Sequence, residues 1–290
     1  MKFLTTDLSI SDSGNEIIIS GNGTYKLPLP MEGSRPIIYP ELKADLTSNS
    51  TSYTGPIYNL IAAAKSTEGS LTKQSPDLEI ADYPRTNYYF DESGCVTLDG
   101  FKASWYMDEG ILPFTALVFP STIKILSIFD IANVDTEVYK CSSGEIIFRN
   151  PYITLISKEA RGADVFPYEV ATSLINATMD SEVQVAASHF MSALDRIKLF
   201  ISREDDNCVS LEFNDKGLFL YNCDKSCVEQ ISAEALEDFT CYIDIDNLVS
   251  QLKAFDSDDI ITLGYGNDQF IQLSAECLGQ IVVLSETEGA

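Results

Sequence analysis

The sequence contains few of the residues and none of the short motifs on which enzymes most often depend. Its 290 residues include one histidine, His189, and no P-loop, dinucleotide-binding glycine motif, serine-hydrolase elbow or zinc-protease motif. His189 falls at the start of an expected helix, where a capping or surface role is the simpler interpretation. The acidic clusters at 204–206 and 256–259 could bind Ca²⁺ or Mg²⁺, but their positions between a helix and a strand favour turns. We therefore expect a protein that is not an enzyme, with no catalytic residue, no metal site and no cofactor.

Long apolar runs are also absent. The most hydrophobic stretch, residues 111–134, is interrupted by Pro113, Pro120, Lys124 and Asp130, so it does not predict a membrane span. The first seven residues lack the apolar region of a secretory signal peptide. These two features predict a cytoplasmic protein without membrane contact.

The seven cysteines do not form a disulfide pattern. Their number is odd, and most lie in apolar, strand-like runs, as Cys241 does. Reduced thiols in the core explain this distribution better than a disulfide framework. Cys223 and Cys227 are the one close pair, and a single Cys-x3-Cys spacing with no second pair or nearby histidine is weak support for a zinc site.

Basic residues are scarce, and their scarcity bears on the choice of partner. The chain has 19 Lys and Arg against 44 Asp and Glu, which gives a formal net charge of −25. That sum argues against nucleic acid, because phosphate contacts need cations, yet an acidic protein can hold DNA if its few cations share one surface. The plain interpretation of the acid excess is a well-solvated exterior.

A pattern that occurs three times is the strongest organisational signal. Segments 13–29, 143–156 and 265–284 each contain a glycine turn, a β-prone run, a short turn and a second β-prone run, which predicts a hairpin. The marker glycines Gly14, Gly144 and Gly266 are 130 and 122 residues apart (144 − 14 and 266 − 144). Such a spacing is the length of a domain rather than of a solenoid repeat.

Amphipathic helices accompany the last two copies of this pattern. Apolar periodicity predicts helices at 56–65 and within 118–129 in the second copy, and at 188–201 and within 242–255 in the third. The fold class is therefore α+β, with repeated domains that each pack two helices on antiparallel β-sheets. We expect an incomplete first domain of strands only at 1–55, a middle domain at 56–180 and a C-terminal domain at 181–290, with a linker at 43–54, a loop at 66–86 and a further hairpin at 209–221.

Cations occur on the exposed faces of these helices. Phe190, Leu194 and Ile197 have helical spacing and predict the buried face of the helix at 188–201, which leaves Arg196 opposite. A lone exposed Lys or Arg is often only a solvated side chain, but its recurrence in an acid-rich chain favours non-specific, salt-sensitive phosphate contacts. The candidate DNA-binding residues are Lys65, Lys124, Arg196, Lys198, Arg203 and Lys253.

Several segments, in their order and spacing, resemble a known family. They are T-L-D-G-F-K-A at 97–103, E-I-I-F at 145–148, L-I-S-K at 155–158 with G-A-D-V-F-P-Y at 162–168, A-L-D-R-I at 193–197 and Q-I-V-V-L at 280–284. Together these segments, within roughly residues 56–286, resemble the bacterial DNA polymerase sliding clamp, the DNA polymerase III beta subunit. The resemblance implies a DNA clamp fold in which six domains close a ring, with helices around the hole and strands outside. It also implies a processivity factor of DNA replication that encircles duplex DNA and tethers the polymerase.

The resemblance further implies a cleft between the middle and last domains. In the family this cleft binds short peptides with Leu and aromatic anchors, by which DNA polymerase and the clamp loader attach. The matching positions here are Leu98, Gly100, Ala103, Ala171, Leu174, Val282 and Leu284, each of which could instead be ordinary core. The chain departs from the family pattern at Phe101, Ala103 and 284–286, so its peptide preference can differ.

The shortened first domain leaves the assembly open. A homodimer of three-domain subunits would lack a normal partner surface, and a homotrimer of two-domain subunits becomes possible. The alternative function is an acidic, clamp-derived DNA mimic or decoy that binds replication partners without encircling DNA. An enzyme is the third interpretation, supported only by unpaired carboxylates and by Cys223 with Cys227.

Overall fold

The computed structural model divides the chain into two compact units, residues 1–48 and 49–290. It describes residues 9–14, 16–21, 23–29, 31–32, 35–36, 50–75, 77–128, 134–201, 207–233 and 237–285. Each unit is considered by itself below.

The first unit is built on a three-stranded antiparallel sheet. Its strands β1 (Ser9–Asp12), β2 (Glu16–Ser20) and β3 (Thr24–Pro28) pair in chain order, and two short strands follow, β4 (Met31–Glu32) and β5 (Arg35–Pro36). Ile19 is buried, whereas Tyr25 and Leu27 on β3 are 51% and 50% exposed. The described residues 9–36 contain no helix, so this small sheet has little apolar surface to bury.

The second unit contains two copies of one element order. The first copy, here called the middle repeat, consists of β6 (Ser50–Pro56), α1 (Tyr58–Thr67), β7 (Tyr88–Asp91), β8 (Gly94–Leu98), β9 (Lys102–Met107), β10 (Ala116–Val118), α2 (Pro120–Ile128), β11 (Asp135–Cys141), β12 (Glu145–Arg149) and β13 (Thr154–Lys158). The second, here called the C-terminal repeat, consists of β14 (Ser181–Ala186), α4 (Ala187–Lys198), β15 (Cys208–Asn214), β16 (Gly217–Asn222), β17 (Val228–Ile231), β18 (Phe239–Asp244), α5 (Ile245–Leu252), β19 (Ile260–Tyr265), β20 (Phe270–Ala275) and β21 (Leu278–Val283). The helix α3 (Tyr168–Ile175) connects them, and two short 3₁₀ helices, η1 (Glu68–Ser70) and η2 (Ile80–Thr86), follow α1.

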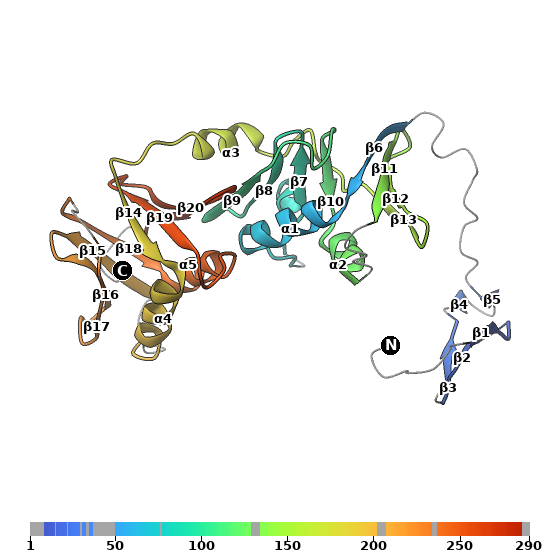
Figure 1. Cartoon of the computed structure of the whole chain (residues 1–290), viewed down its shortest axis with the longest axis horizontal. Helices are drawn as coiled ribbons and strands as arrows, with labels where there is room; N and C mark the ends of the chain where they lie inside the picture. Colours follow the sequence, from blue (N-terminus) through green and yellow to red (C-terminus); the bar gives the residue numbers. More distant parts are fainter. Residues whose placement is uncertain are drawn as a thin grey trace. The chain divides into compact units, whose positions relative to one another are not determined.

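One sheet runs through both repeats (Figure 1). Its strand order is β10-β7-β8-β9-β21-β20-β19-β14, so four strands of each repeat join where β9 pairs antiparallel with β21. Each repeat adds a four-stranded sheet of its own, β13-β12-β11-β6 in the middle repeat and β17-β16-β15-β18 in the C-terminal repeat. This architecture confirms the predicted α+β class, with two helices on antiparallel sheets in each repeat.

Most predicted elements are present, and the predicted linker is partly wrong. The marker glycines Gly14, Gly144 and Gly266 have φ values of 87°, 87° and 96°, in the turns before β2, β12 and β20. The four expected helices and the hairpin at 209–221 are confirmed, with ends shifted by a few residues. The expected linker at 43–54 overlaps β6, which pairs with β11 along its whole length, and residues 43–49 lie outside the described residues. The expected loop at 66–86 contains the end of α1 and both 3₁₀ helices.

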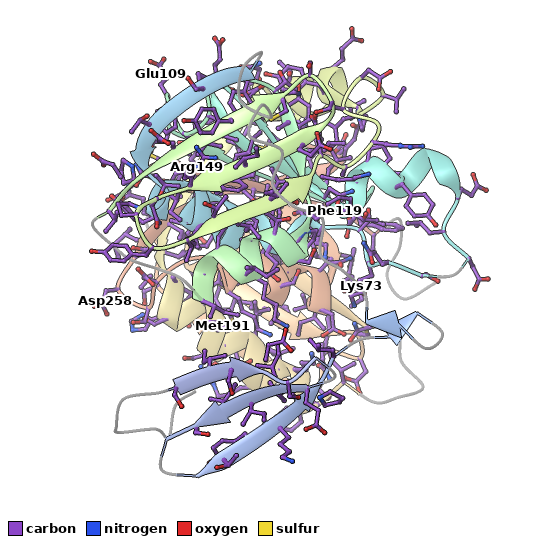
Figure 2. The ribbon with its side chains drawn as sticks, turned by 90° about the vertical axis from the view of Figure 1, so that its right-hand side faces the viewer. Lys73, Glu109, Phe119, Arg149, Met191 and Asp258 are labelled. Atoms are coloured by element: carbon purple, nitrogen blue, oxygen red, sulfur yellow. The ribbon has the colours of Figure 1, made fainter. Side chains whose placement is uncertain are left out.

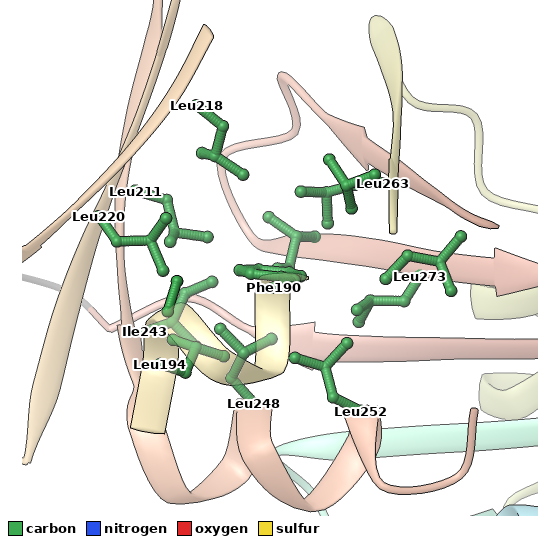
Figure 3. Packing of buried hydrophobic residues seen from close by; sticks show 14 of the residues in the cluster. Phe190, Leu194, Leu211, Leu218, Leu220, Ile243, Leu248, Leu252, Leu263 and Leu273 are labelled. Atoms are coloured by element: carbon green, nitrogen blue, oxygen red, sulfur yellow. The ribbon is translucent and has the colours of Figure 1, made fainter. Parts of the chain in front are cut away.

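Helix amphipathicity explains the core of the C-terminal repeat. Phe190, Leu194 and Ile197 on α4 are fully buried, together with Leu248 and Leu252 on α5 (Figure 3). Burial of each such side chain contributes about 1.5–3 kcal/mol. At the start of α5, the Asp244 carboxylate accepts a hydrogen bond from the backbone N–H of Asn247 at 2.8 Å, as an N-cap does. Polar side chains occupy the exterior, where Glu109 and Asp258 extend into solvent (Figure 2).

The junction of the repeats is packed tightly and contains a buried polar cluster. We call the β9–β21 pairing, with the side chains around it, the seam. Gln251 on α5 donates to Ser70 Oγ at 2.6 Å and accepts from Ser104 Oγ at 2.7 Å, and all three side chains are fully buried. Gly279 lies opposite Trp105 across the seam. Because a Cβ at Gly279 would lie 2.2 Å from Trp105 Cε2, only glycine fits there.

Adding one methyl group at Gly279 therefore tests the seam. We expect Gly279→Ala to lower the free energy of unfolding by about 1–3 kcal/mol, because the added methyl group would overlap the buried indole of Trp105. Urea titration followed by the fluorescence of Trp105, the chain's single tryptophan, measures this. The matched control is Gly23→Ala, whose Cβ would meet Tyr25 at an ordinary 3.5 Å. Equal stability of the two variants would contradict the packing described.

Candidate functional site

The eight-stranded sheet separates two surfaces of the second unit. On β8, the Thr97 hydroxyl donates to the Thr67 carbonyl of α1 at 2.5 Å, whereas the next residue, Leu98, packs in the same cluster as Ala171 of α3. This alternation places α1 on one face of the sheet and α3 on the other. Figure 1 shows α1, α2, α4 and α5 on the first side of this unit, which we call the helix surface, and α3 on the second, which we call the α3 surface.

Two predicted cations meet on the helix surface of the middle repeat. Lys65 in the last turn of α1 and Lys124 on α2 are both exposed and line one depression of about 460 Å³. Tyr88 lies in its floor, and burial is the main cause that raises the pKa of its phenol, followed by the nearby Glu68 carboxylate. Two ammonium groups thus share a mostly apolar hollow that is open to solvent.

Arg196 on α4 is occupied by a partner in its own repeat. Its Nε and Nη2 donate to the two carboxylate oxygens of Glu229 on β17, both at 2.8 Å. This bidentate hydrogen bonding is the main cause that raises the pKa of Arg196 and lowers the pKa of Glu229. The ion pair is therefore fully charged at neutral pH, and it is lost only as pH falls through the lowered pKa of Glu229.

The remaining predicted cations differ in their surroundings. Lys198 donates to the Asp246 carboxylate, which also accepts from Asn207, and the Lys198 hydrogen bond is the main cause that lowers the pKa of Asp246. Lys253 directly follows α5 and is exposed. Arg203 lies outside the described residues. The structure therefore brings Lys65 and Lys124 together, and it neutralises Arg196 and Lys198 locally.

An apolar cluster underlies the α3 surface and contains four of the residues predicted for the cleft. Leu98, Ala103 and Ala171 are nearly fully buried in it, and Leu174 packs against it. Trp105 belongs to the same cluster and is 6% exposed. These residues come from β8, β9 and α3, so the middle repeat supplies most of this surface.

The C-terminal strand contributes different residues from those predicted. Val282 is fully buried in the core of the C-terminal repeat, and Leu284 packs against that same core. Their neighbour Ile281 belongs to the cluster under α3, and strand alternation puts Val283 on that face too. A shift of one residue along β21 exchanges the two faces, so Ile281 and Val283 lie on the face toward this cluster, and neither was among the predicted residues. The pairing of Ile281 with Ala103 would have identified them.

Gly100 and Phe101 form the rim of this surface. Gly100 has a φ of 100°, which a side chain would disfavour, in a turn closed by the Asp99 carboxylate. That carboxylate accepts from the backbone N–H groups of Phe101 and Lys102, both at 2.9 Å. The Val283 N–H donates to the Phe101 carbonyl at 2.9 Å, which places the two residues side by side. Phe101 is 64% exposed and Val283 is 38% exposed, so apolar side chains face solvent here.

Other features considered from the sequence have structural explanations. His189 is exposed and makes no capping hydrogen bond at the start of α4, so the surface interpretation holds for it. The Asp259 carboxylate accepts from the backbone N–H of Asp256 at 2.8 Å, which confirms a turn at 256–259. The cluster at 204–206 lies outside the described residues. Among the residues that the structure does describe, none of the helices has the length and hydrophobicity needed to cross a bilayer.

The cysteines are free thiols, as expected. Cys95, Cys141, Cys208 and Cys241 are buried, and burial is the main cause that raises the pKa of Cys241 to about 12. Cys223 is exposed and donates to the Cys208 carbonyl at 3.3 Å. Within the described residues, no group of three His, Cys, Asp or Glu side chains is arranged to hold a metal ion.

Comparison with solved structures identifies the fold. No protein-family model and no curated protein matches the sequence. The structure is similar to the DNA polymerase sliding clamp of Bacillus subtilis (TM-score 0.74, 18% identity, 99% of this chain and 77% of that chain). It is similar also to the DNA polymerase III subunit beta of Pseudomonas aeruginosa (TM-score 0.75, 13% identity, 99% and 79%) and to the sliding clamp of Caulobacter crescentus (TM-score 0.71, 15% identity, 97% and 77%). The chain thus has the DNA sliding-clamp fold.

Proposed function

We propose that this chain is a non-catalytic sliding clamp that encloses duplex DNA and tethers a DNA polymerase. The observation that carries the proposal is the pair of complete clamp repeats joined in one sheet, with four helices on one side. That arrangement gives an assembly of several copies a helix-lined inner surface. The likeness to solved sliding clamps over almost the whole chain supports the same function.

Enclosure explains how a chain with a net charge of −25 can hold DNA. A closed ring is retained by topology, so it needs no strong phosphate binding. The hollow that contains Lys65 and Lys124 offers weak, non-specific phosphate contacts, and the ion pairs of Arg196 and Lys198 keep other contacts weaker still. Weak contacts that salt screens easily are compatible with movement along the duplex.

The α3 surface is the proposed attachment site for partners. Its exposed side chains, Phe101 and Val283, lie beside the apolar cluster that contains Leu98, Ala103 and Leu174. Buried apolar anchors dominate the affinity of such surfaces, so a peptide with Leu and aromatic side chains fits this chemistry. DNA polymerase and a clamp loader would carry such peptides.

A second candidate is an acidic decoy that binds replication partners without enclosing DNA. The observation that favours it is the local neutralisation of Arg196 by Glu229 and of Lys198 by Asp246. Both candidates use the α3 surface, and only the clamp is retained on circular DNA. Retention therefore separates them.

Retention on a closed DNA circle tests the clamp function. The protein is incubated with a nicked plasmid at high concentration and separated by gel filtration. We expect protein to elute with the circle and to be released when the plasmid is cut once, because a ring slides off free ends. Lys124→Glu should weaken the salt-sensitive binding to linear DNA, whereas the matched charge reversal Lys216→Glu, in the exposed turn between β15 and β16, should not. Equal binding to linear and circular DNA would rule out enclosure.

The Arg196–Glu229 pair predicts an unusual gain of DNA binding. Glu229→Gln removes the carboxylate that holds the guanidinium, so at low salt we expect the affinity for linear DNA to rise by about two- to tenfold, as for one added phosphate contact. The control Glu212→Gln makes the same change in charge at a carboxylate of β15, which lies 3.0 Å from Lys225 Nζ. The salt dependence of binding to linear DNA measures the effect. An equal gain in both variants would show a change of net charge alone.

The fluorescence of Trp105 reports peptide binding at the α3 surface. A synthetic peptide with Leu and Phe anchors should change the fluorescence of this single tryptophan, because it lies in the cluster beneath the binding surface. Val283→Asp should abolish the change, since it puts a charge where an apolar anchor would dock. The control Val228→Asp places the same charge at an exposed site on β17, which belongs to a different sheet from the strand of Trp105. Unaltered titration of Val283→Asp would argue for another site.

A further inference from the structure

Two cysteines lie side by side on one hairpin of the C-terminal repeat. Val209 on β15 pairs with Asn222 on β16, and one further step along this register places Cys208 opposite Cys223. Because Val209 belongs to the core of the repeat, its neighbour Cys208 points to the opposite face of the sheet, and residues paired across two strands share a face. Both thiols are therefore on the face turned away from the core, at the end of the hairpin remote from its turn.

The distance between the strands suits a bond between the two sulfurs. The Sγ of Cys223 donates to the carbonyl of Cys208 at 3.3 Å, which directs the Cys223 side chain toward β15. Opposite residues of antiparallel strands have Cα atoms about 4.5–5.5 Å apart. A disulfide spans Cα separations of about 4.4–6.8 Å, so neither strand would have to move.

The backbone is fixed beside each cysteine. The carbonyl of Asn207, which precedes Cys208, accepts from the backbone N–H of the first residue of α5 at 2.9 Å. The side chain of Asn222, which precedes Cys223, is buried and donates to the Phe200 carbonyl at 3.3 Å. Two reacting groups that are held in place react far faster than the same groups on separate molecules.

The two thiols differ in their access to solvent. Cys223 is exposed, whereas Cys208 is 5% exposed. Burial is the main cause that raises the pKa of Cys208, and a hydrogen bond with the Ser285 side chain acts in the opposite direction. Because oxidants react with accessible thiolates, a small oxidant in solution reaches Cys223 before Cys208.

We propose that Cys208 and Cys223 are a modification site, at which hydrogen peroxide forms a reversible disulfide. The Cys223 thiolate attacks one oxygen of the peroxide, the O–O bond breaks and hydroxide leaves, so Cys223 becomes a sulfenic acid. The Cys208 sulfur then attacks the Cys223 sulfur, and the S–S bond forms as the S–O bond breaks. The hydroxide that leaves takes the Cys208 proton and becomes water. Two thiols are thus oxidised, and one peroxide is reduced to two molecules of water.

Cys227 is the nearer neighbour of Cys223 in the sequence but points the other way. Val228 pairs with Tyr221 on the face turned away from the core, so strand alternation directs Cys227 toward the core. In agreement, Cys227 is partly buried and packs against the core of the C-terminal repeat. The turn between Cys223 and Cys227 therefore separates their sulfurs.

Within the described strands, no other cysteine has a second cysteine opposite it. Cys277 is exposed, but it lies in the turn between β20 and β21. The remaining three are buried, and their strand partners are Tyr106 for Cys95, Ser50 for Cys141 and Leu211 for Cys241. Geometry therefore selects one pair among the seven cysteines.

The bond would change the stability of the hairpin and could be reversed. It would join β15 to β16 at the end opposite the turn, and a covalent link of this kind restricts the unfolded chain. Because Cys223 is exposed, thiol reductants could reach the disulfide and break it. The proposal is independent of the proposed clamp function, and its test needs neither DNA nor a partner peptide.

Mass spectrometry of the full chain tests the site. The reduced protein is treated with hydrogen peroxide, the remaining thiols are alkylated, and the product is digested without reductant. We expect two thiols per chain to be lost, a peptide pair linked through Cys208 and Cys223, and recovery of both thiols in dithiothreitol. The oxidised protein should also unfold at a higher urea concentration than the reduced protein, as followed by circular dichroism.

Serine variants assign the two roles. In Cys208→Ser, Cys223 should stop at the sulfenic acid, so dimedone should label it about tenfold more than in the unaltered chain. Cys223→Ser should abolish the linked peptides and the shift in urea midpoint. The matched controls Cys227→Ser and Cys277→Ser, each of which also removes one accessible thiol, should retain both.

Several outcomes would overturn the proposal. One is a link between Cys223 and Cys227, and another is a link between two chains in place of the internal one. Retention of all seven thiols under the same peroxide treatment would also contradict it. A urea midpoint lowered by oxidation would show that the bond forms only when the hairpin is distorted, against the geometry described.

Discussion

The antiparallel pairing of β9 with β21 is the interaction on which the rest of the structure depends. It joins two repeats into one eight-stranded sheet, and the sheet then assigns every strand residue to one of two faces. Thr97 and Ser104 point to the helix surface, whereas Leu98 and Ala103 point to the α3 surface. Both proposed functions, the inner lining and the partner site, therefore need the seam, where Gly279 leaves room for the indole of Trp105 on the opposite strand.

Electrostatic attraction is the weaker of the two means by which this chain would hold DNA, the other being closure of a ring. With a net charge of −25 and a screening length of about 8 Å at physiological salt, the chain cannot attract DNA from a distance. Cations act only where side chains are close to a phosphate, and two of the candidates, Arg196 and Lys198, are held by acids of their own repeat. A clamp of this kind would contact DNA lightly and rely on closure for retention.

The sequence predicted the helices and strands better than it predicted which of them are in contact. Hairpins followed from Gly14, Gly144 and Gly266 because each turn needs a positive φ, and helices followed from apolar periodicity, which is a local property. What could not be predicted depends on tertiary contacts. The strand β6 is rich in Ser and Thr, and its place in the sheet depends on its pairing with β11 and on the packing of Tyr53 against the core of the middle repeat.

In the candidate site too, local patterns could be predicted from the sequence and tertiary contacts could not. Leu98, Ala103, Ala171 and Leu174 meet in the cluster under α3, whereas Val282 lies in the core of the C-terminal repeat and Leu284 packs against that core. The sequence could not separate these two faces, because β21 is apolar on both sides. The salt bridge of Arg196 with Glu229 joins residues far apart in the chain, so no local pattern could reveal it.

The seam joins two repeats that belong to one chain. This covalent connection keeps the repeats at a high effective concentration, so the geometry of the contact matters more than its affinity. The buried hydrogen bonds of Ser70, Ser104 and Gln251 define that geometry, because each of these polar side chains would be left without a partner if the two repeats shifted relative to one another.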